Sequence, residues 1–361
     1  MMGIEAEGAN GVLGTTGRDA NARLYRRRAT EIVGSGFALP SDRVDNDAFF
    51  ARARFPLGDA AARAELVDAT RMKTRTWCAP GEHTWTLARD AVAMALASSE
   101  VPASEIDLVI VSSCSTMPVV NYPNPANPVM ADLAPLVLAQ LGREDGVGID
   151  LKAAYCAGFL RGLEMMDAML ENPGYRAGLL VAADEGGRFA TAESNKSAFC
   201  FIVGDAAGAV VLRKTDVAPG ARVGVVDYVS QTVPSKAELT GWGADGRSLF
   251  VKGARAGAAG LELMVGVGRR LMERNGLRAE GIDWLLPAQT HAQTVDALCD
   301  GLGMPREKLL WSGDQTGYAA SASIAAALGA RRAEGKVRRG DLVLSVAVGA
   351  GMNVAGALYY A

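Results

Sequence analysis

The sequence carries one series of apolar segments twice, in the same order. The pairs are IDLVIVSS (106–113) with IDWLLPAQ (282–289), AGLLVAAD (177–184) with GDLVLSVAV (340–348), and GDAAGAVVL (204–212) with GMNVAGALYY (351–360). Each segment has the length of a buried strand, and Ala-rich helical patterns such as EHTWTLARDAVAMALASS separate them. Strands that alternate with helices are typical of α/β proteins with largely buried sheets. The repeat therefore predicts two similar α/β halves that pack together.

The domain boundaries follow from where this pattern begins and where it restarts. Residues 1–28 are Gly-rich, polar and without periodicity, so we expect a flexible N-terminal extension. The segment DVAPGAR (216–222) separates the two series, and we assign 29–217 to an N-terminal half and 218–361 to a C-terminal half. The expected strands of the first half are 106–114, 146–151, 177–184 and 208–213.

The composition argues against several classes of function. A formal net charge of -3 provides no field that would recruit nucleic acid or an anionic membrane. No segment has the roughly 18 consecutive apolar residues of a membrane span. The first thirty residues lack the apolar core of a signal peptide, so we expect a cytoplasmic protein. The five cysteines are an odd number without C-x-x-C spacing, which argues against a disulfide framework and against a metal site.

One cysteine, Cys156, stands at the joint between a predicted strand and a predicted helix in GVGIDLKAAYCAGFLRGLEMMDAML (146–170). A thiol in the first turn of a helix lies beside unpaired N–H groups and the positive end of the helix dipole, which favour the nucleophilic thiolate. Small neighbours leave room for a substrate carbonyl to approach. An apolar stripe would anchor the helix in the core: Phe159, Leu163, Met166 and Leu170. This stretch alone fits a reactive thiol and a small buried residue equally well.

Several motifs in a fixed order favour the reactive thiol. The segments AYCAGF (154–159) and GDAAGA (204–209), followed by IDWLLPAQ and VGAGMNVAG, resemble the ketoacyl synthase III family of the thiolase superfamily over nearly the whole chain. The resemblance implies a thiolase-like five-layer αβαβα fold made of two duplicated halves, assembled as a homodimer. It implies that Cys156 accepts an acyl group from acyl-CoA or an acyl carrier protein, with no bound cofactor. The N–H groups of Cys156 and Gly351 would then form the oxyanion hole.

Two positions depart from the family pattern. The family supplies a histidine in a P-H-Q-A-N motif and an asparagine in a G-N-T motif, and together they hold the malonyl thioester during decarboxylation. Here the segments read PAQTH and GYA, so Ala288 and Tyr318 occupy the two donor positions. By position, Ala288, Gln289 and Tyr318 belong to the substrate-binding site. His291 is the candidate catalytic substitute for the missing histidine, and its alternative role is to cap or pack a helix end.

Other residues are secondary candidates. His83, the second of the two histidines, is interpreted as a turn residue rather than a catalytic one, and Asp314 as a solvated loop carboxylate rather than a base. Tyr318 either donates a hydrogen bond from its hydroxyl or fills the pocket. The acyl pocket is expected to draw side chains from several loops, including Met117, Tyr122 and Trp242.

The replaced donors separate two steps of the chemistry. Acyl capture needs a thiolate and an oxyanion hole, whereas decarboxylative condensation needs the two donors that have changed. We therefore predict an acyltransferase that forms an acyl thioester on Cys156 and passes it to an acceptor, in a secondary-metabolite or fatty-acid-like pathway. The alternatives are a decarboxylating β-ketoacyl synthase with a rebuilt donor site and a non-catalytic thiolase-like subunit of an acyltransferase complex. The expected assembly is a homodimer or a complex with other thiolase-like subunits.

Overall fold

A five-stranded sheet forms the core of the N-terminal half in the computed structural model, which describes residues 28–53, 58–115, 132–152, 154–191, 198–242 and 249–361. Its strands are β1 (Arg28–Ala38), β4 (Ile106–Ser112), β5 (Val147–Leu151), β6 (Ala177–Glu185) and β7 (Asp205–Asp216). Their order in the sheet is β1-β7-β6-β4-β5. β4 runs parallel to β5 and β6, whereas β7 is antiparallel to both of its neighbours.

A four-stranded sheet forms the core of the C-terminal half. Its strands are β8 (Val225–Thr232), β11 (Trp284–Leu285), β12 (Leu342–Gly349) and β13 (Asn353–Tyr360), in the order β11-β12-β13-β8. β11 and β12 are parallel, and β13 is antiparallel to β12 and β8. Each of these strands therefore matches one strand of the first sheet in order and direction, with β8 in the place of β1. The predicted duplication is confirmed, because the three sequence pairs fall on β4 and β11, β6 and β12, and β7 and β13.

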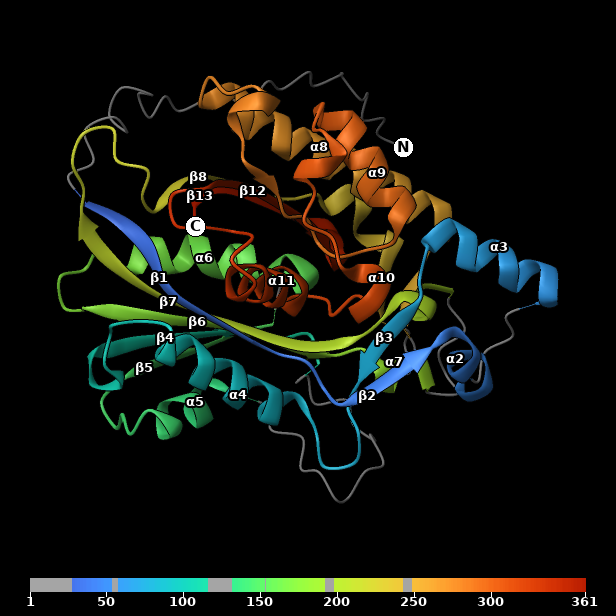
Figure 1. Ribbon diagram of the computed structural model, residues 1–361, viewed down its shortest axis with the longest axis horizontal. Helices are drawn as coiled ribbons and strands as arrows, with labels where there is room; N and C mark the ends of the chain where they lie inside the picture. The colour runs from blue at the N-terminus through green and yellow to red at the C-terminus, as the bar shows by residue number, and fades with distance from the viewer. Residues whose placement is uncertain (1–27, 54–57, 116–131, 153, 192–197, 243–248) are drawn as a thin grey trace, which may run out of the picture.

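Helices form three layers around the two sheets, which gives the predicted five-layer αβαβα fold (Figure 1). The middle layer holds α6 (Gly158–Met169) and α11 (Ala322–Ala333), which lie between the sheets. The outer face of the first sheet is covered by α4 (Thr84–Ala97) and α5 (Ala134–Gln140). The outer face of the second is covered by α8 (Gly253–Arg274) and α9 (Ala292–Leu302). Separate apolar clusters fill the spaces between these layers.

Smaller elements complete the fold, and those labelled in Figure 1 lie at one end of the layers. The two-stranded sheets are β2 (Asp42–Asp45) with β3 (Thr74–Trp77), and β9 (Thr240–Trp242) with β10 (Leu249–Val251). The short helices are α2 (Asn46–Arg52), α3 (Ala60–Thr70), α7 (Gly187–Thr191) and α10 (Gly313–Thr316).

Two predicted strands differ in length from those observed. The segment 282–289 contains only the two strand residues of β11, although the backbone N–H groups of Leu286 and Ala288 still donate to Leu344 and Val346 of β12. Strand β7 extends beyond the expected 208–213 at both ends, because β1 pairs with it along almost its whole length. β1 begins at Arg28, and residues 1–27 of the expected extension lie outside the described residues.

The middle helix α6 packs closely against the first sheet. This contact positions the start of the helix and the turn before it, which carries Cys156. Its predicted apolar stripe is buried as expected. A Cβ on Gly162 would lie 2.6 Å from Leu180 of β6, and a Cβ on Gly158 would lie 1.9 Å from the Ser112 hydroxyl at the end of β4. Since real Cβ atoms do not approach so closely, these two glycines permit the close contact between helix and sheet.

Candidate active site

Cys156 lies in a tight turn that connects β5 to α6. The turn is the 3-10 helix Tyr155–Ala157, and Ala157 caps α6, so the thiol lies just before the helix rather than in its first turn as predicted. The two residues before it, Ala154 and Tyr155, have φ values of 83° and 46°. Residues other than glycine rarely adopt this left-handed conformation, and such backbone strain is concentrated at functional sites.

The parallel strands of the first sheet bring three polar residues to one edge. β4 lies between β5 and β6, and Cys114 follows β4 while Cys156 follows β5. Asp184 is the penultimate residue of β6, next to the end of β4. The carboxyl ends of parallel strands meet at the same edge of a sheet, so residues distant in sequence become neighbours there.

Two protonated side chains surround the Cys156 sulfur. The pKa of Cys156 lies below that of an ordinary thiol, first because the Cys114 side chain forms a hydrogen bond to it. Burial opposes this decrease, and a hydrogen bond from the Tyr318 side chain adds to it. The pKa of Cys114 is raised by the same hydrogen bond and by burial, and that of Tyr318 by burial and by the charge of Cys156. Cys156 is therefore the group that ionises, and its two partners stay protonated as donors.

Asp184 holds the loop that carries Cys114. Its buried carboxylate accepts hydrogen bonds from the backbone N of Cys114 at 2.6 Å and from the hydroxyl of Ser115 at 2.8 Å. From the C-terminal half, Ser321 donates its hydroxyl at 2.5 Å and its backbone N at 2.9 Å. Burial raises the pKa of Asp184, and the hydrogen bonds that favour its charged form oppose the increase. Asp184 thus connects the two halves of the protein next to Cys156.

The glycine-rich turn after β12 packs directly on the Cys156 turn. A Cβ on Gly349 would lie 2.1 Å from the carbonyl oxygen of Ala154 and 2.9 Å from the backbone nitrogen of Cys156. Gly351 has a φ of 85°, a conformation that glycine adopts without strain. The Asn353 amide donates to the Ala350 carbonyl at 2.6 Å, which closes the turn. The two turns that the resemblance assigned to the oxyanion hole therefore lie in contact.

Tyr318 reaches the same site from a loop of the C-terminal half. Its backbone N donates to Ile202 at 2.7 Å, and its carbonyl accepts from Gly204 at 3.1 Å, so the loop is fixed to the N-terminal half. Its ring is buried and meets the Phe199 ring edge to face at 5.8 Å. Of its two predicted roles, hydrogen-bond donor and pocket filler, the hydroxyl performs the first towards Cys156 while the ring occupies buried space.

The remaining residues of the altered motif have different environments. Ala288 is buried and offers no polar side chain at the position where the family has its histidine. Gln289 is also buried, and its amide is bound to the backbone of Pro287, Leu310 and Ser312. The nitrogen and the oxygen of the Gln289 amide both hold the loop through these hydrogen bonds, so Gln289 has a structural role. The substrate-binding role expected from its position stays a prediction.

His291 is the N-cap residue of α9. Its Nε2 lies 3.1 Å from the Thr294 hydroxyl, one turn into the helix, and its Nδ1 is buried without a hydrogen-bond partner among the described residues. Burial lowers the pKa of His291, which favours the neutral imidazole. The position is the helix end that the sequence offered as an alternative to a catalytic role, and among the described residues the ring forms no hydrogen bond with Cys156.

The secondary candidates have structural contacts. His83 is the N-cap residue of α4, where its backbone N donates to Thr86 at 2.9 Å. The expectation for Asp314 was wrong: its carboxylate is buried rather than solvated, and it pairs with Lys73 at 2.9 Å. The expected acyl-pocket residues Met117 and Tyr122 lie outside the described residues, and Trp242 ends β9.

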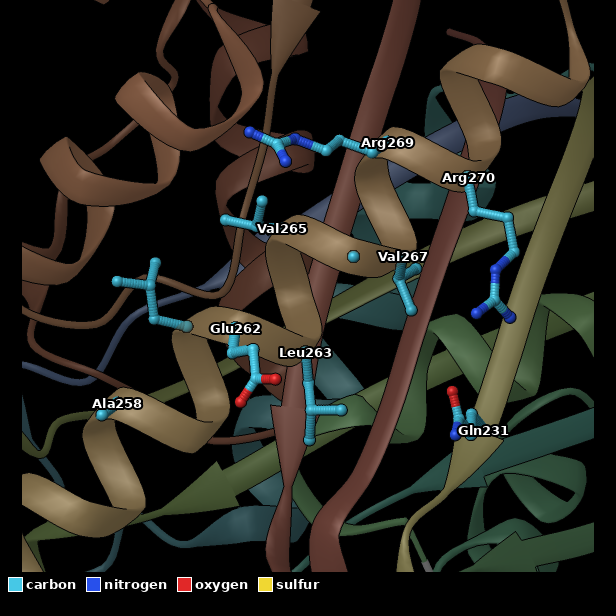
Figure 2. Close-up of a pocket in the computed structure, with 10 residues that line it drawn as sticks. Gln231, Ala258, Glu262, Leu263, Val265, Val267, Arg269 and Arg270 are labelled. Carbon is cyan, nitrogen blue, oxygen red and sulfur yellow. The ribbon is translucent and has the colours of Figure 1, made fainter. Parts of the chain in front are cut away.

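A separate pocket of about 580 Å³ lies on the surface of α8. It is lined by residues of α8, with Gln231 of β8 at its edge, and Figure 2 shows Arg269 and Arg270 at one end of it and Glu262 further along the helix. None of the residues around the Cys156 sulfur lines it. Within the described ranges, no cluster of side chains has the composition of a metal site, and no helix is long and apolar enough to cross a membrane.

Sequence reasoning missed Cys114 and Asp184. Most of the cysteines were expected to be small core residues, a description that Cys200 and Cys299 fit but Cys114 does not. A usable signal was present, because the predicted strands before Cys114 and Cys156 belong to the same parallel sheet. Their ends had to meet at one edge if the two strands were neighbours.

Two family models match the chain. The model described as 3-oxoacyl-[acyl-carrier-protein (ACP)] synthase III matches residues 149–232, which include the Cys156 turn. The model described as the C-terminal part of the same synthase matches residues 272–361, which include Ala288, Tyr318 and Gly351. Cys156, Asp184 and Tyr318 therefore fall inside the matched regions, whereas Cys114 precedes them.

Curated relatives match the chain over nearly their whole length. The β-ketoacyl-[acyl-carrier-protein] synthase III of Sphingopyxis alaskensis is 30% identical over 343 residues, which cover 91% of this chain and 97% of that protein. The synthase of the same name from Bradyrhizobium diazoefficiens is 30% identical over 336 residues, with 91% and 97% covered.

Solved structures show the same fold. The 3-oxoacyl-[acyl-carrier-protein] synthase III of Aquifex aeolicus superposes with a TM-score of 0.78 at 25% identity, covering 92% of this chain and 100% of that one. The priming β-ketosynthase of the R1128 polyketide pathway gives 0.77 at 26% identity, with 92% and 97% covered. OleA of Xanthomonas campestris gives 0.77 at 17% identity, with 92% and 99% covered, and at that identity the likeness concerns the fold alone.

Proposed function

The chain belongs to the 3-oxoacyl-[acyl-carrier-protein] synthase III family and is an acyl-transferring enzyme, and from this we propose that it loads an acyl group on Cys156 and transfers it without decarboxylation. In the loading step the Cys156 sulfur attacks the thioester carbonyl of the donor. The new carbon–sulfur bond replaces the bond to the donor thiol, which leaves with the proton that Cys156 gave up. The proposed donor is an acyl-CoA or an acyl carrier protein, and the names of the relatives indicate the carrier protein.

The observation that carries the proposal is the pair of donors around the Cys156 sulfur. The Cys114 thiol and the Tyr318 hydroxyl favour the thiolate, so the nucleophile is activated without a neighbouring imidazole. A subunit that had lost its chemistry would have no reason to keep a thiol of lowered pKa beside a strained turn. The site therefore favours an enzyme over a non-catalytic subunit.

The tetrahedral intermediate needs an oxyanion hole, and we assign it to the backbone N–H groups of Cys156 and Gly351. The close contact of Gly349 with the Cys156 nitrogen supports this assignment, because it holds the two turns together. Backbone donors that are fixed before the reaction are effective because they require no reorganisation when charge develops.

The replaced donors limit the second step. Ala288 supplies no hydrogen bond, and Tyr318 bonds to Cys156 instead of to a second thioester, so an enolate formed by decarboxylation would have neither of the usual partners. Losing one such donor typically costs about 10²–10³ in rate. We therefore propose an acceptor that is already nucleophilic, such as an alcohol, an amine, an aromatic carbon or a carrier thiol. The decarboxylating alternative would require His291 to leave its contact with Thr294.

The proposed assembly is a homodimer, or a complex with a related chain. Strand β5 forms the free edge of the first sheet, and Val147 on it is 37% exposed, one of two large apolar side chains with so much exposure among the described residues. An unpaired strand edge with apolar side chains favours pairing with another chain. We propose that β5 faces a second subunit, and that the protein acts in the cytoplasm in fatty-acid-like or secondary-metabolite synthesis.

Mass spectrometry of the intact protein tests the proposal. The protein would be incubated with acetyl-CoA, malonyl-CoA and longer acyl-CoA donors, then with hydroxyl, amine and aromatic acceptors, while labelled carbon dioxide from malonyl-CoA is collected. We expect one acyl group on Cys156, its loss to an acceptor, and slow release of carbon dioxide. No mass gain with any donor would support a non-catalytic subunit, and rapid release of carbon dioxide would support the decarboxylating alternative.

A further inference from the structure

Two thiols of this protein face each other, and they differ from the other three. The side chains of Cys114 and Cys156 share a hydrogen bond, and both are partly exposed. Cys200 and Cys299 are buried in separate apolar clusters, one in each half, and the thiol of Cys78 faces the buried carboxylate of Asp205. The contact between sulfurs comes from the fold, since both residues follow adjacent parallel strands, with Ser112 of β4 paired to Leu151 of β5.

From this geometry we propose that Cys114 and Cys156 form a site of reversible oxidation, in which hydrogen peroxide converts the pair to a disulfide. The inference goes beyond the proposed acyl transfer, because it concerns a modification of the nucleophile and not its substrate. The disulfide occupies the sulfur that would carry the acyl group, so the oxidised protein cannot be loaded. Reduction by a dithiol restores both thiols and the activity.

The chemistry balances in two steps. The Cys156 thiolate attacks one oxygen of hydrogen peroxide, an S–O bond forms, the O–O bond breaks and hydroxide leaves, which gives a sulfenic acid. The Cys114 sulfur then attacks the Cys156 sulfur, the S–S bond forms and the S–O bond breaks, and water leaves with the Cys114 proton. The two thiols together lose two electrons to the peroxide.

The arrangement supplies what each step requires. The first step needs an accessible thiolate, and Cys156 is the thiol favoured as thiolate and is partly exposed. The second needs a resolving thiol that reaches the sulfenic acid before a second peroxide does. Cys114 is already in contact with the Cys156 sulfur, and Asp184 fixes its backbone through the 2.6 Å bond. Without that neighbour a sulfenic acid proceeds to sulfinic acid, which dithiols do not reduce.

Mass measurement on the full-length protein tests the inference. The reduced protein would be exposed to stoichiometric hydrogen peroxide, then analysed as intact protein and as peptides under non-reducing conditions. We expect the loss of two hydrogen atoms, one peptide pair that joins Cys114 to Cys156, and loss of iodoacetamide labelling at Cys156 that dithiothreitol reverses. Cys114→Ser, given at least two equivalents of hydrogen peroxide, is expected to gain two oxygen atoms at Cys156 instead, and dithiothreitol should not restore labelling. Cys299→Ala is the matched control and should behave like the unmodified protein.

Two results would overturn the inference. One is sulfinic acid at Cys156 of the unmodified protein while Cys114 remains free, and the other is a disulfide that joins Cys114 to a different cysteine. Cys114→Ala repeats the test if Cys114→Ser does not fold, and the peptide map of the unmodified protein needs no variant. Because every measurement is a mass or a label, a failure of the proposed acyl transfer would leave this test unaffected.

Discussion

The two halves of the molecule share one topology but contribute opposite chemistry to the site. At the carboxyl ends of its parallel strands the N-terminal half places Cys114, Cys156 and Asp184, all polar and connected by hydrogen bonds. At the matching edge of the C-terminal half, Ala288 is apolar, and Tyr318 extends to Cys156 of the other half. A duplicated fold thus preserves positions at strand ends, while the residue at each position decides which chemical step is possible.

The largest effect on the difference between the two halves is expected when the Cys156 thiol is removed. Cys156→Ala should abolish acyl loading and the rapid reaction with iodoacetamide at neutral pH, because no other thiol has a lowered pKa and two donors. The fold should persist, as judged by circular dichroism, because the side chain lost is small. Cys299→Ala serves as the control. Loading that survives in Cys156→Ala, or faster labelling of Cys78 or Cys299, would show that the nucleophile is assigned wrongly.

Substitution can introduce, at positions 288 and 318, the histidine and asparagine of the family pattern. The double variant Ala288→His with Tyr318→Asn should raise the rate of malonyl-CoA decarboxylation by about 10²- to 10³-fold, since it supplies hydrogen bonds to the developing enolate. The release of labelled carbon dioxide measures the gain, and Tyr318→Phe, which provides no amide, is the control. If the unmodified protein already decarboxylates as fast as the double variant, the replaced residues Ala288 and Tyr318 do not limit decarboxylation.

The contact between the halves can be disturbed at Gly349. A methyl group there would overlap the Ala154 carbonyl and press on the Cys156 nitrogen, so Gly349→Ala should displace one side of the oxyanion hole. We expect acyl loading to fall by about 10²-fold and the free energy of unfolding to fall by about 1–3 kcal/mol. Gly257→Ala in α8 is a control, since nothing lies within 4 Å of the added Cβ. Equal loading rates in the two variants would argue against the assigned oxyanion hole.

The donors around Cys156 predict a change in pH dependence. Because the hydrogen bonds from Cys114 and Tyr318 lower the pKa of Cys156, removing either should raise that pKa and move the alkylation profile to higher pH. Below the new pKa less thiolate is present, so the rate at neutral pH should fall by about two- to tenfold, the factor for one hydrogen bond of about 0.5–1.5 kcal/mol. The larger effect is expected in Cys114→Ala and the smaller in Tyr318→Phe. Iodoacetamide rates over a range of pH measure it, and profiles that coincide with the unmodified protein would contradict it.

The smallest effect is expected at His291. Its ring contacts Thr294 at the start of α9, so His291→Ala should change acyl loading by less than about twofold and lower the free energy of unfolding by about 1 kcal/mol or less. His291→Asn should be at least as stable as the unmodified protein, because asparagine is a better N-cap. A loss of loading or condensation by more than tenfold in both variants, with stability retained, would restore His291 as a catalytic residue.

Local sequence patterns determined the architecture and the position of the nucleophile. The alternation of short apolar runs with Ala-rich helices, repeated in one order, was enough to predict two halves, because strand and helix periodicity are properties of neighbouring residues. The same reasoning placed Cys156 between a strand and a helix, whereas the changed positions Ala288 and Tyr318 followed from the resemblance to the ketoacyl synthase III family. It also located His291 at the start of a helix without deciding what its ring contacts.

Only the tertiary structure decided which groups surround the Cys156 sulfur. Cys114 and Tyr318 lie far from Cys156 in the sequence, and no periodicity relates residues that meet through strand pairing and helix packing. Asp314 illustrates the same limit, because it is buried and pairs with Lys73, which lies far from it in the sequence. The sequence attributed the stability of the Cys156 thiolate to the start of the following helix, but α6 begins just after Cys156. The hydrogen bond that lowers the pKa of Cys156 most comes instead from Cys114, which follows the adjacent strand. A sequence specifies each strand end, but which ends become neighbours is decided when the sheet forms.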